Sequence, residues 1–132
     1  MNKGDILELA ERVEALEGED REIDLAIAKM RRVTVWKHDP ETGTNYETTH
    51  WHYTASLDAA MTLVPEGFSW EVGETADGGH ATVSKMPDDD EAYAGGRLPA
   101  PDIQISAYAA TPALALTAAC LRVIAERGKD NG

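Results

Sequence analysis

The first 32 residues repeat apolar positions with the spacing of an α-helix. Between residues 5 and 16, one helical face collects Ile6, Leu9, Ala10, Val13 and Leu16. Gly18 ends this pattern, and Asp20 is placed to cap a second helix. The inner face of that second helix holds Ile23, Ala26, Ile27 and Met30. Two helices joined by so short a link predict a helical hairpin over residues 1–32.

The period changes from helical to alternating in residues 33–53. Two β-rich runs, 33–37 and 46–53, flank turn residues that include Pro40 and Gly43. This arrangement predicts an aromatic and histidine-rich β-hairpin. In the second strand, His50 and His52 would lie on one face and Trp51 on the other.

Along residues 53–70 the predicted structure changes from extended chain to a central helix and then to a strand. Ser56 is a good N-cap residue, and Pro65 with Gly67 ends the helix. Beyond it, Phe68, Trp70 and Val72 alternate with polar residues, as in a half-buried strand.

Two more strands and a helix complete the predicted core, residues 54–128. The Asp77-Gly78 step predicts a hairpin between strands 68–72 and 81–86, and residues 102–108 form a third strand. The acidic stretch 87–101 between them lacks periodicity and is predicted to be a flexible loop. Thr111 caps the last helix, which is apolar on so broad a surface that it must be buried.

These elements predict one α+β domain over residues 1–132. It combines the N-terminal helical hairpin, a small, mostly antiparallel sheet, a central helix and a buried C-terminal helix, an α/β/α sandwich-like arrangement. The apolar fraction of 42% fits a globular chain, and the 132 residues suffice for a single core.

Charge and cysteine content narrow the function classes. With 24 acidic and 12 basic residues the formal charge is −12, which disfavours binding to nucleic acid or to an anionic membrane. The single cysteine, Cys120, lies in the most apolar helix and is expected to be a buried core residue. No signal-peptide pattern is visible, so we expect a cytoplasmic protein.

Two stretches carry a resemblance to a known family. Residues 53–70 and 107–122, the latter including the sequence Ala-Thr-Pro-Ala-Leu-Ala-Leu at 110–116, resemble the phage ABA-sandwich family. These are small proteins of phages and prophages, with a sheet between helical layers and, for most members, no assigned role. The resemblance implies this fold, a phage origin and a host-cell cytoplasm, and it brings no catalytic motif.

An aromatic and basic cluster is the main candidate ligand site. Aromatic rings close in sequence to arginines and histidines could stack a nucleobase and neutralise a phosphate, and two helix N-termini could each offer backbone N–H groups to an anion. The candidate ligand-binding residues are Arg31, Arg32, Trp36, His50, Trp51, His52, Tyr53, Ser56 and Thr111. The same aromatics could instead pack in the core or at a subunit interface, and the two hydroxyls could simply cap helices.

Other candidate chemistry is weaker. His50 and His52 have a spacing that lets both bind one metal, with His38 or His80 completing the set, but this matches no strong zinc signature. The acidic run 88–91 is a poor match to a calcium loop. We therefore predict no metal, no cofactor and no catalytic residue.

The reverse face of the predicted sheet is polar. If the apolar residues of the three strands face the helices, the other face presents Ser69, Glu71, Thr82, Ser84, Gln104, Ser106 and Tyr108. Such a row suits a polar ligand, a wet subunit interface or plain solvent exposure.

These features favour a non-enzymatic, phage-encoded binding protein, expected to be a homo-oligomer, that sequesters a small polar host molecule. In the most specific form of this hypothesis the captured molecule is a nucleotide immune signal, and the chain would be an anti-defence sponge. The alternative is a protein-interaction module that inhibits a host protein or assists phage assembly, with the aromatics as anchors. A hydrolase that uses His50 or His52 is a third class.

Overall fold

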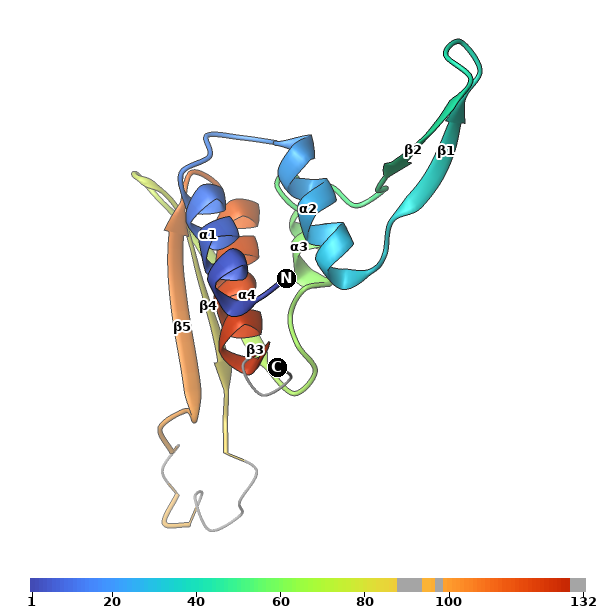
Figure 1. The fold of residues 1–132 in the computed structure, drawn as a ribbon. Helices are drawn as coiled ribbons and strands as arrows, with labels where there is room; N and C mark the ends of the chain where they lie inside the picture. Colours follow the sequence, from blue (N-terminus) through green and yellow to red (C-terminus); the bar gives the residue numbers. More distant parts are fainter. Residues whose placement is uncertain (88–93, 97–98, 129–132) are drawn as a thin grey trace.

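The computed structural model describes residues 1–87, 94–96 and 99–128 (Figure 1). Its helices are α1 (Lys3–Glu14), α2 (Arg21–Arg31), α3 (Leu57–Met61) and α4 (Pro112–Gly128). Its strands are β1 (Val35–Asp39), β2 (Thr44–Thr48), β3 (Ser69–Thr75), β4 (Gly78–Lys85) and β5 (Ile103–Ala109). Most of the predicted acidic loop 87–101, including its run 88–91, lies outside the described residues.

Strands β3, β4 and β5 form one antiparallel sheet in sequential order. Thr75 pairs with Gly78 at the β3–β4 turn, so the hairpin predicted from the Asp77-Gly78 step is confirmed. In the middle of the sheet, Val83 pairs with Ile105 and is fully buried. The alternation of apolar and polar residues therefore sets the register, because a slip by one residue would turn Val83 to the solvent.

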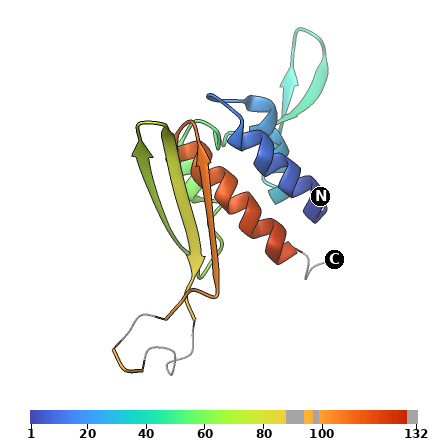
Figure 2. The ribbon, with the colours of Figure 1, turned by 90° about the vertical axis from the view of Figure 1, so that its left-hand side faces the viewer.

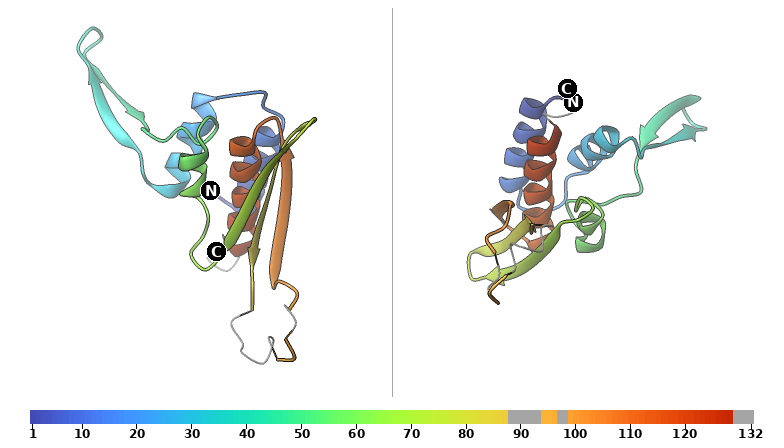
Figure 3. Two further views of the ribbon diagram at one scale, coloured as in Figure 1. Left: turned by 180° about the vertical axis from the view of Figure 1, so that it is seen from behind. Right: turned by 90° about the horizontal axis from the view of Figure 1, so that it is seen from below.

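Helix α4 packs across β4 and β5, and α1 packs along α4. Residues 113–121 of α4 are all buried, which confirms the predicted burial of this helix. Figures 2 and 3 show the helices on one side of the three-stranded sheet, and no described helix covers its other face. The α+β class is confirmed. None of the described helices has the length and apolar character that a bilayer crossing requires.

The two N-terminal helices do not pack on each other as a hairpin. Helix α1 lies beside α4, whereas α2 lies on the other side of α4, near α3 (Figure 1). Helix α4 offers the apolar face of α1 a larger apolar surface to pack on than α2 does. An ion pair between Glu14 of α1 and Arg122 of α4 fixes this contact, with Arg122 Nε 3.4 Å from Glu14 Oε2.

Strands β1 and β2 form a separate two-stranded sheet that projects from the body (Figures 1 and 3). We call residues 35–48 the projecting hairpin. The second strand was predicted to reach Tyr53, but it ends at Thr48. The guanidinium of Arg21 donates to the carbonyls of Thr49 and Trp51, so those groups bond to a side chain rather than to a strand.

The glycines at the start of β4 allow a close approach of the turn that precedes α4. Gly78 has φ +134°, and a Cβ there would lie 2.5 Å from the Ala109 carbonyl oxygen. A Cβ on Gly79 would overlap the backbone of Thr111 and Pro112. Glycine is therefore required where β4 meets the first turn of α4.

Substitution Gly79→Ala should destabilise the fold by about 2 to 3 kcal/mol, because the added methyl group meets backbone that cannot rotate away. Gly18→Ala is the matched control, since a Cβ there has nothing within 4 Å, and it should change stability by less than about 0.5 kcal/mol. Urea unfolding of both variants measures the difference. Equal effects would contradict the close approach.

Burial raises the pKa of the Cys120 thiol from 9.0 to about 12. The unfolded chain therefore ionises this thiol above pH 9 while the folded chain keeps it neutral, so folding stability should fall as pH rises. We expect the stability of the parent relative to a Cys120→Ala variant to fall by about 1.4 kcal/mol between pH 8 and pH 10. Denaturant unfolding at both pH values measures this, and a pH-independent difference would exclude it.

Candidate functional site

The uncovered face of the three-stranded sheet carries the predicted row of polar side chains. The strand register places Ser69, Ser84 and Gln104 in one row across the sheet, and Glu71, Thr82 and Ser106 in the next. All are exposed or partly exposed. The prediction that these residues share the face opposite the helices is confirmed.

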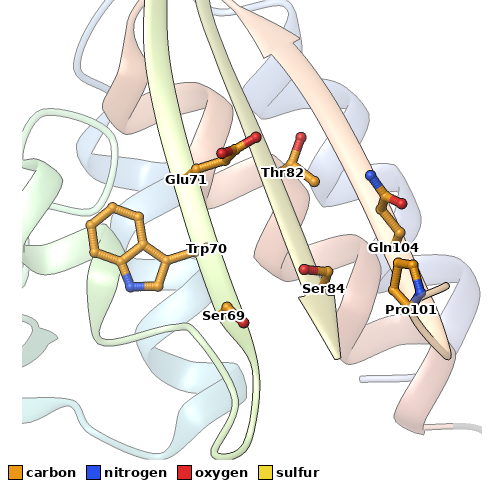
Figure 4. Close-up of a pocket in the computed structure, with 7 residues that line it drawn as sticks. All are labelled: Ser69, Trp70, Glu71, Thr82, Ser84, Pro101 and Gln104. Carbon is orange, nitrogen blue, oxygen red and sulfur yellow. The ribbon is translucent and has the colours of Figure 1, made fainter. Parts of the chain in front are cut away.

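A shallow pocket of about 210 Å³ opens on this face (Figure 4). It is lined by Ser69, Trp70, Glu71, Thr82, Ser84, Pro101 and Gln104. Figure 4 shows the carboxylate of Glu71 directed toward Thr82 on the neighbouring strand. The pocket thus combines hydroxyl, amide and carboxylate groups from three adjacent strands.

Most polar side chains of the pocket have no hydrogen-bond partner among the described residues. Within the described part of the chain, four lining side chains make no hydrogen bond: Ser69, Glu71, Ser84 and Gln104. Thr82 is engaged, with its Oγ1 2.9 Å from Ser106 Oγ. The unpaired groups are available to a ligand, and hydrogen bonds to such fixed groups would orient it.

Among the described residues that line the pocket, Glu71 carries the one charged side chain. A carboxylate accepts hydrogen bonds from hydroxyl, amide or ammonium groups and repels phosphate. The pocket therefore favours a neutral or cationic ligand portion that is rich in hydrogen-bond donors.

Trp70 was expected to be buried under the helices, but 36% of it is exposed. Strand β3 is an edge strand, and α4 lies mainly over β4 and β5. Figure 4 shows the indole pointing off the free edge of β3, away from the other labelled side chains. The ring therefore lies at the free edge of the sheet instead of in the core.

An aromatic row continues the same face beyond the pocket. Gly73, His80 and Tyr108 are paired across the three strands. The His80 ring lies over Gly73, where a Cβ would be 2.5 Å from its Cε1, and its centroid is 6.3 Å from that of Tyr108. With 73% of its surface exposed, Tyr108 offers a ring face to solvent.

The structure brings together only part of the predicted aromatic and basic cluster. Arg31, Trp51 and Tyr53 line a small pocket of about 100 Å³, in which the two aromatic rings stack with centroids 6.2 Å apart. Nη1 of Arg31 donates to the Thr62 carbonyl at 2.6 Å. Tyr53 is buried, and this burial raises the pKa of its phenol. It is a core residue, so within this pocket the aromatic surface open to a ligand belongs to Trp51, which is 39% exposed.

Arg32 and Trp36 do not join this cluster. Arg32 ends α2 in a left-handed conformation, with φ 61°, and its side chain is exposed. Trp36 lies on the projecting hairpin and does not line the small pocket. Sequence proximity suggested one cluster, but the hairpin carries Trp36 away from the body.

The predicted histidine pair is not formed on a strand. His50 and His52 follow the end of β2, and His50 is exposed. Nδ1 of His52 lies 2.7 Å from Glu19 Oε1, while Nδ1 of His38 lies 2.8 Å from the side-chain oxygen of Asn45. His80 lies on the sheet face, so the four histidines are not gathered as a metal site would require.

A different trio has the spacing of metal ligands. One atom each from Glu19, Asp24 and His52 lies within 4.8 Å of the others. The oxygens of the fully buried Asp24 already accept from Arg21 Nη1 at 2.9 Å and from the Thr54 N–H at 2.8 Å. The positive guanidinium balances the buried carboxylate, so the arrangement is explained by protein groups alone.

This network was not anticipated from the sequence. Asp24 follows Ile23 on the apolar side of α2, three residues after Arg21. An acid on an inner helical face with a basic residue at i−3 was the available signal. It holds residues 49–54 against α2 and thereby sets the base of the projecting hairpin.

Ser56 and Thr111 are occupied as helix caps. Ser56 Oγ accepts from the Ala59 N–H at 3.3 Å, and Thr111 Oγ1 accepts from the Leu114 N–H at 3.2 Å. Pro112 has no N–H to offer, which further weakens anion binding at α4. Thr111 and Glu19 also line a cleft of about 430 Å³, whose other walls are mainly small and apolar residues.

Removing the buried carboxylate should be costly. We expect Asp24→Ala to lower the free energy of unfolding by about 3 kcal/mol, because it leaves the Thr54 N–H buried and without its acceptor. Asp24→Asn keeps one oxygen and should cost less, while exposed Glu22→Ala is the neutral control. Urea titrations rank the three variants; a loss no larger than that of Glu22→Ala would show that the network contributes nothing.

Comparisons with known proteins found no relative of this chain. Neither models of protein families, nor curated proteins, nor solved structures match the chain. The resemblance to the phage ABA-sandwich family, and the phage origin that it implies, stay predictions.

Proposed function

We propose that this chain is a non-enzymatic binding protein that captures a small polar molecule on the open face of its sheet. The observation that carries the proposal is the pocket on β3, β4 and β5, whose hydroxyl, amide and carboxylate groups include several that bond to no other described residue. A flat strand surface fixes these groups in space, so a ligand meets preorganised partners.

The charge and the hydrogen-bonding groups of the pocket indicate which kind of ligand it can bind. Because Glu71 is the charged residue in its described lining, the pocket suits the sugar, hydroxyl or amine portion of a molecule better than a phosphate. A nucleotide could present its sugar or base here only if its phosphates pointed outward. In a phage, sequestration of such a host signal would interfere with defence without any catalysis.

A second candidate function is supported by the projecting hairpin. It exposes 68% of Trp36 and 46% of Tyr46 outside the body of the protein. Exposed aromatics of this kind are typical anchors of protein interfaces. A protein-interaction module that inhibits a host protein or assists phage assembly would bind its partner through this segment and would not need the sheet pocket.

Ligand capture can be tested by incubating the purified protein with cyclic and ADP-ribose-type nucleotides, nucleosides and neutral sugars. Small molecules released by denaturation are then identified by mass spectrometry. We expect one compound, chemically unchanged and near one per site. A released product of hydrolysis would instead indicate an enzyme, and an empty protein would favour the interaction module.

Variants locate the site once a compound is recovered. Glu71→Gln should weaken binding about tenfold or more, because it removes the negative charge and replaces one acceptor oxygen with a donor; Gln104→Ala, which removes the amide, should weaken it about fivefold. Asn45→Ala, which removes an exposed strand amide outside the pocket, should leave the affinity unchanged. If Trp51→Ala and Arg32→Ala abolished capture while the pocket variants retained it, the aromatic cluster would be the site instead.

A further inference from the structure

The projecting hairpin is a sheet of only two strands with both outer edges open. Apart from their mutual pairing, β1 and β2 pair with no other described strand. An ion pair of Lys29 with Glu47, with its N and O atoms 3.6 Å apart, ties the hairpin to α2 at its base. Isolated two-stranded hairpins are marginally stable in water, so additional strands would stabilise this one.

The two large exposed aromatics lie on opposite faces of the hairpin. Trp36 is paired with Glu47, and Tyr46 is paired with Lys37, the neighbouring position along each strand. Adjacent residues of a strand point to opposite faces. A partner that covered one face would leave the other aromatic exposed, whereas a partner strand at an edge would contact side chains on both faces.

The charges distinguish the two edges for pairing with a second copy of this chain. In a two-fold antiparallel arrangement centred on β1, Lys37 would face Lys37 of the second copy, which is unfavourable. Centred on β2, Tyr46 faces Tyr46 of the second copy, and Asn45 faces its Glu47. An amide N–H opposite a carboxylate and a pair of tyrosines are both favourable.

From this complementarity we infer that two copies of the chain associate through the outer edges of their β2 strands, with the two-fold axis at Tyr46. The two hairpins then form one four-stranded sheet. Because the paired strands run in opposite directions, the hairpin tips point apart and the two bodies lie at opposite ends. The sheet pocket of each copy is left open, so this association does not depend on the proposed ligand.

Cysteine cross-linking tests the register. Across an antiparallel pair, directly opposite Cβ atoms are ~5 Å apart, which is within reach of a disulfide. We expect a Tyr46→Cys variant to form a covalent dimer on mild oxidation. Lys37→Cys, on the same hairpin face but one strand further from the axis, should stay monomeric in a denaturing gel. The native Cys120 is buried and does not compete.

The outcomes are decisive in either direction. A disulfide from Tyr46→Cys alone supports the β2 edge. A disulfide from Lys37→Cys alone, from both variants equally, or from neither would overturn the inference. Retained circular dichroism spectra establish that both variants are folded.

Sedimentation velocity of the unmodified chain across a concentration series provides a second test. We expect a monomer–dimer equilibrium whose dissociation constant rises about tenfold in Tyr46→Lys, because this substitution places like charges at the axis. Met61→Lys adds the same charge at another exposed position, on α3, and should leave the constant unchanged. A chain that is monomeric throughout, or a dimer indifferent to Tyr46→Lys, would rule out this interface.

Discussion

Helix α4 carries more apolar surface than one neighbour can cover, and the rest of the fold depends on covering it. The sheet packs on one side of the helix and α1 on another, while α3 also contacts it. Each fully buried leucine, such as Leu114, Leu116 or Leu121, contributes about 1.5 to 3 kcal/mol. This demand explains why α1 packs on α4 instead of forming a hairpin with α2.

The polar groups at the edge of this core are hydrogen-bonded to one another. Thr117 of α4 donates to the Tyr53 carbonyl at 2.9 Å, and Asp24 accepts from Arg21 and from the Thr54 N–H. These bonds hold the segment after β2 to both α2 and α4. Since leaving such groups unpaired is costly, the network fixes one path for the chain and so the point where the projecting hairpin leaves the body.

The same core leaves two surfaces uncovered, and they differ in chemistry. The open sheet face is flat, polar and acidic at Glu71, which suits a small hydrogen-bonding ligand. The projecting hairpin exposes aromatic rings and strand edges, which suits a protein partner. Because the two surfaces lie on different sheets, capture of a ligand and association of copies are compatible in one molecule.

Local physics let the sequence by itself determine the elements and their inner faces. The Asp77-Gly78 turn, the caps at Asp20 and Ser56, and the buried α4 follow from capping, turn geometry and periodicity. The polar sheet face, including Gln104, was also predictable because strand side chains alternate. Only tertiary structure decided that α1 meets α4, that Trp70 and Trp36 are exposed, and that residues 49–54 leave the strand. Those outcomes depend on competition between distant surfaces and side chains, which a one-dimensional pattern does not contain.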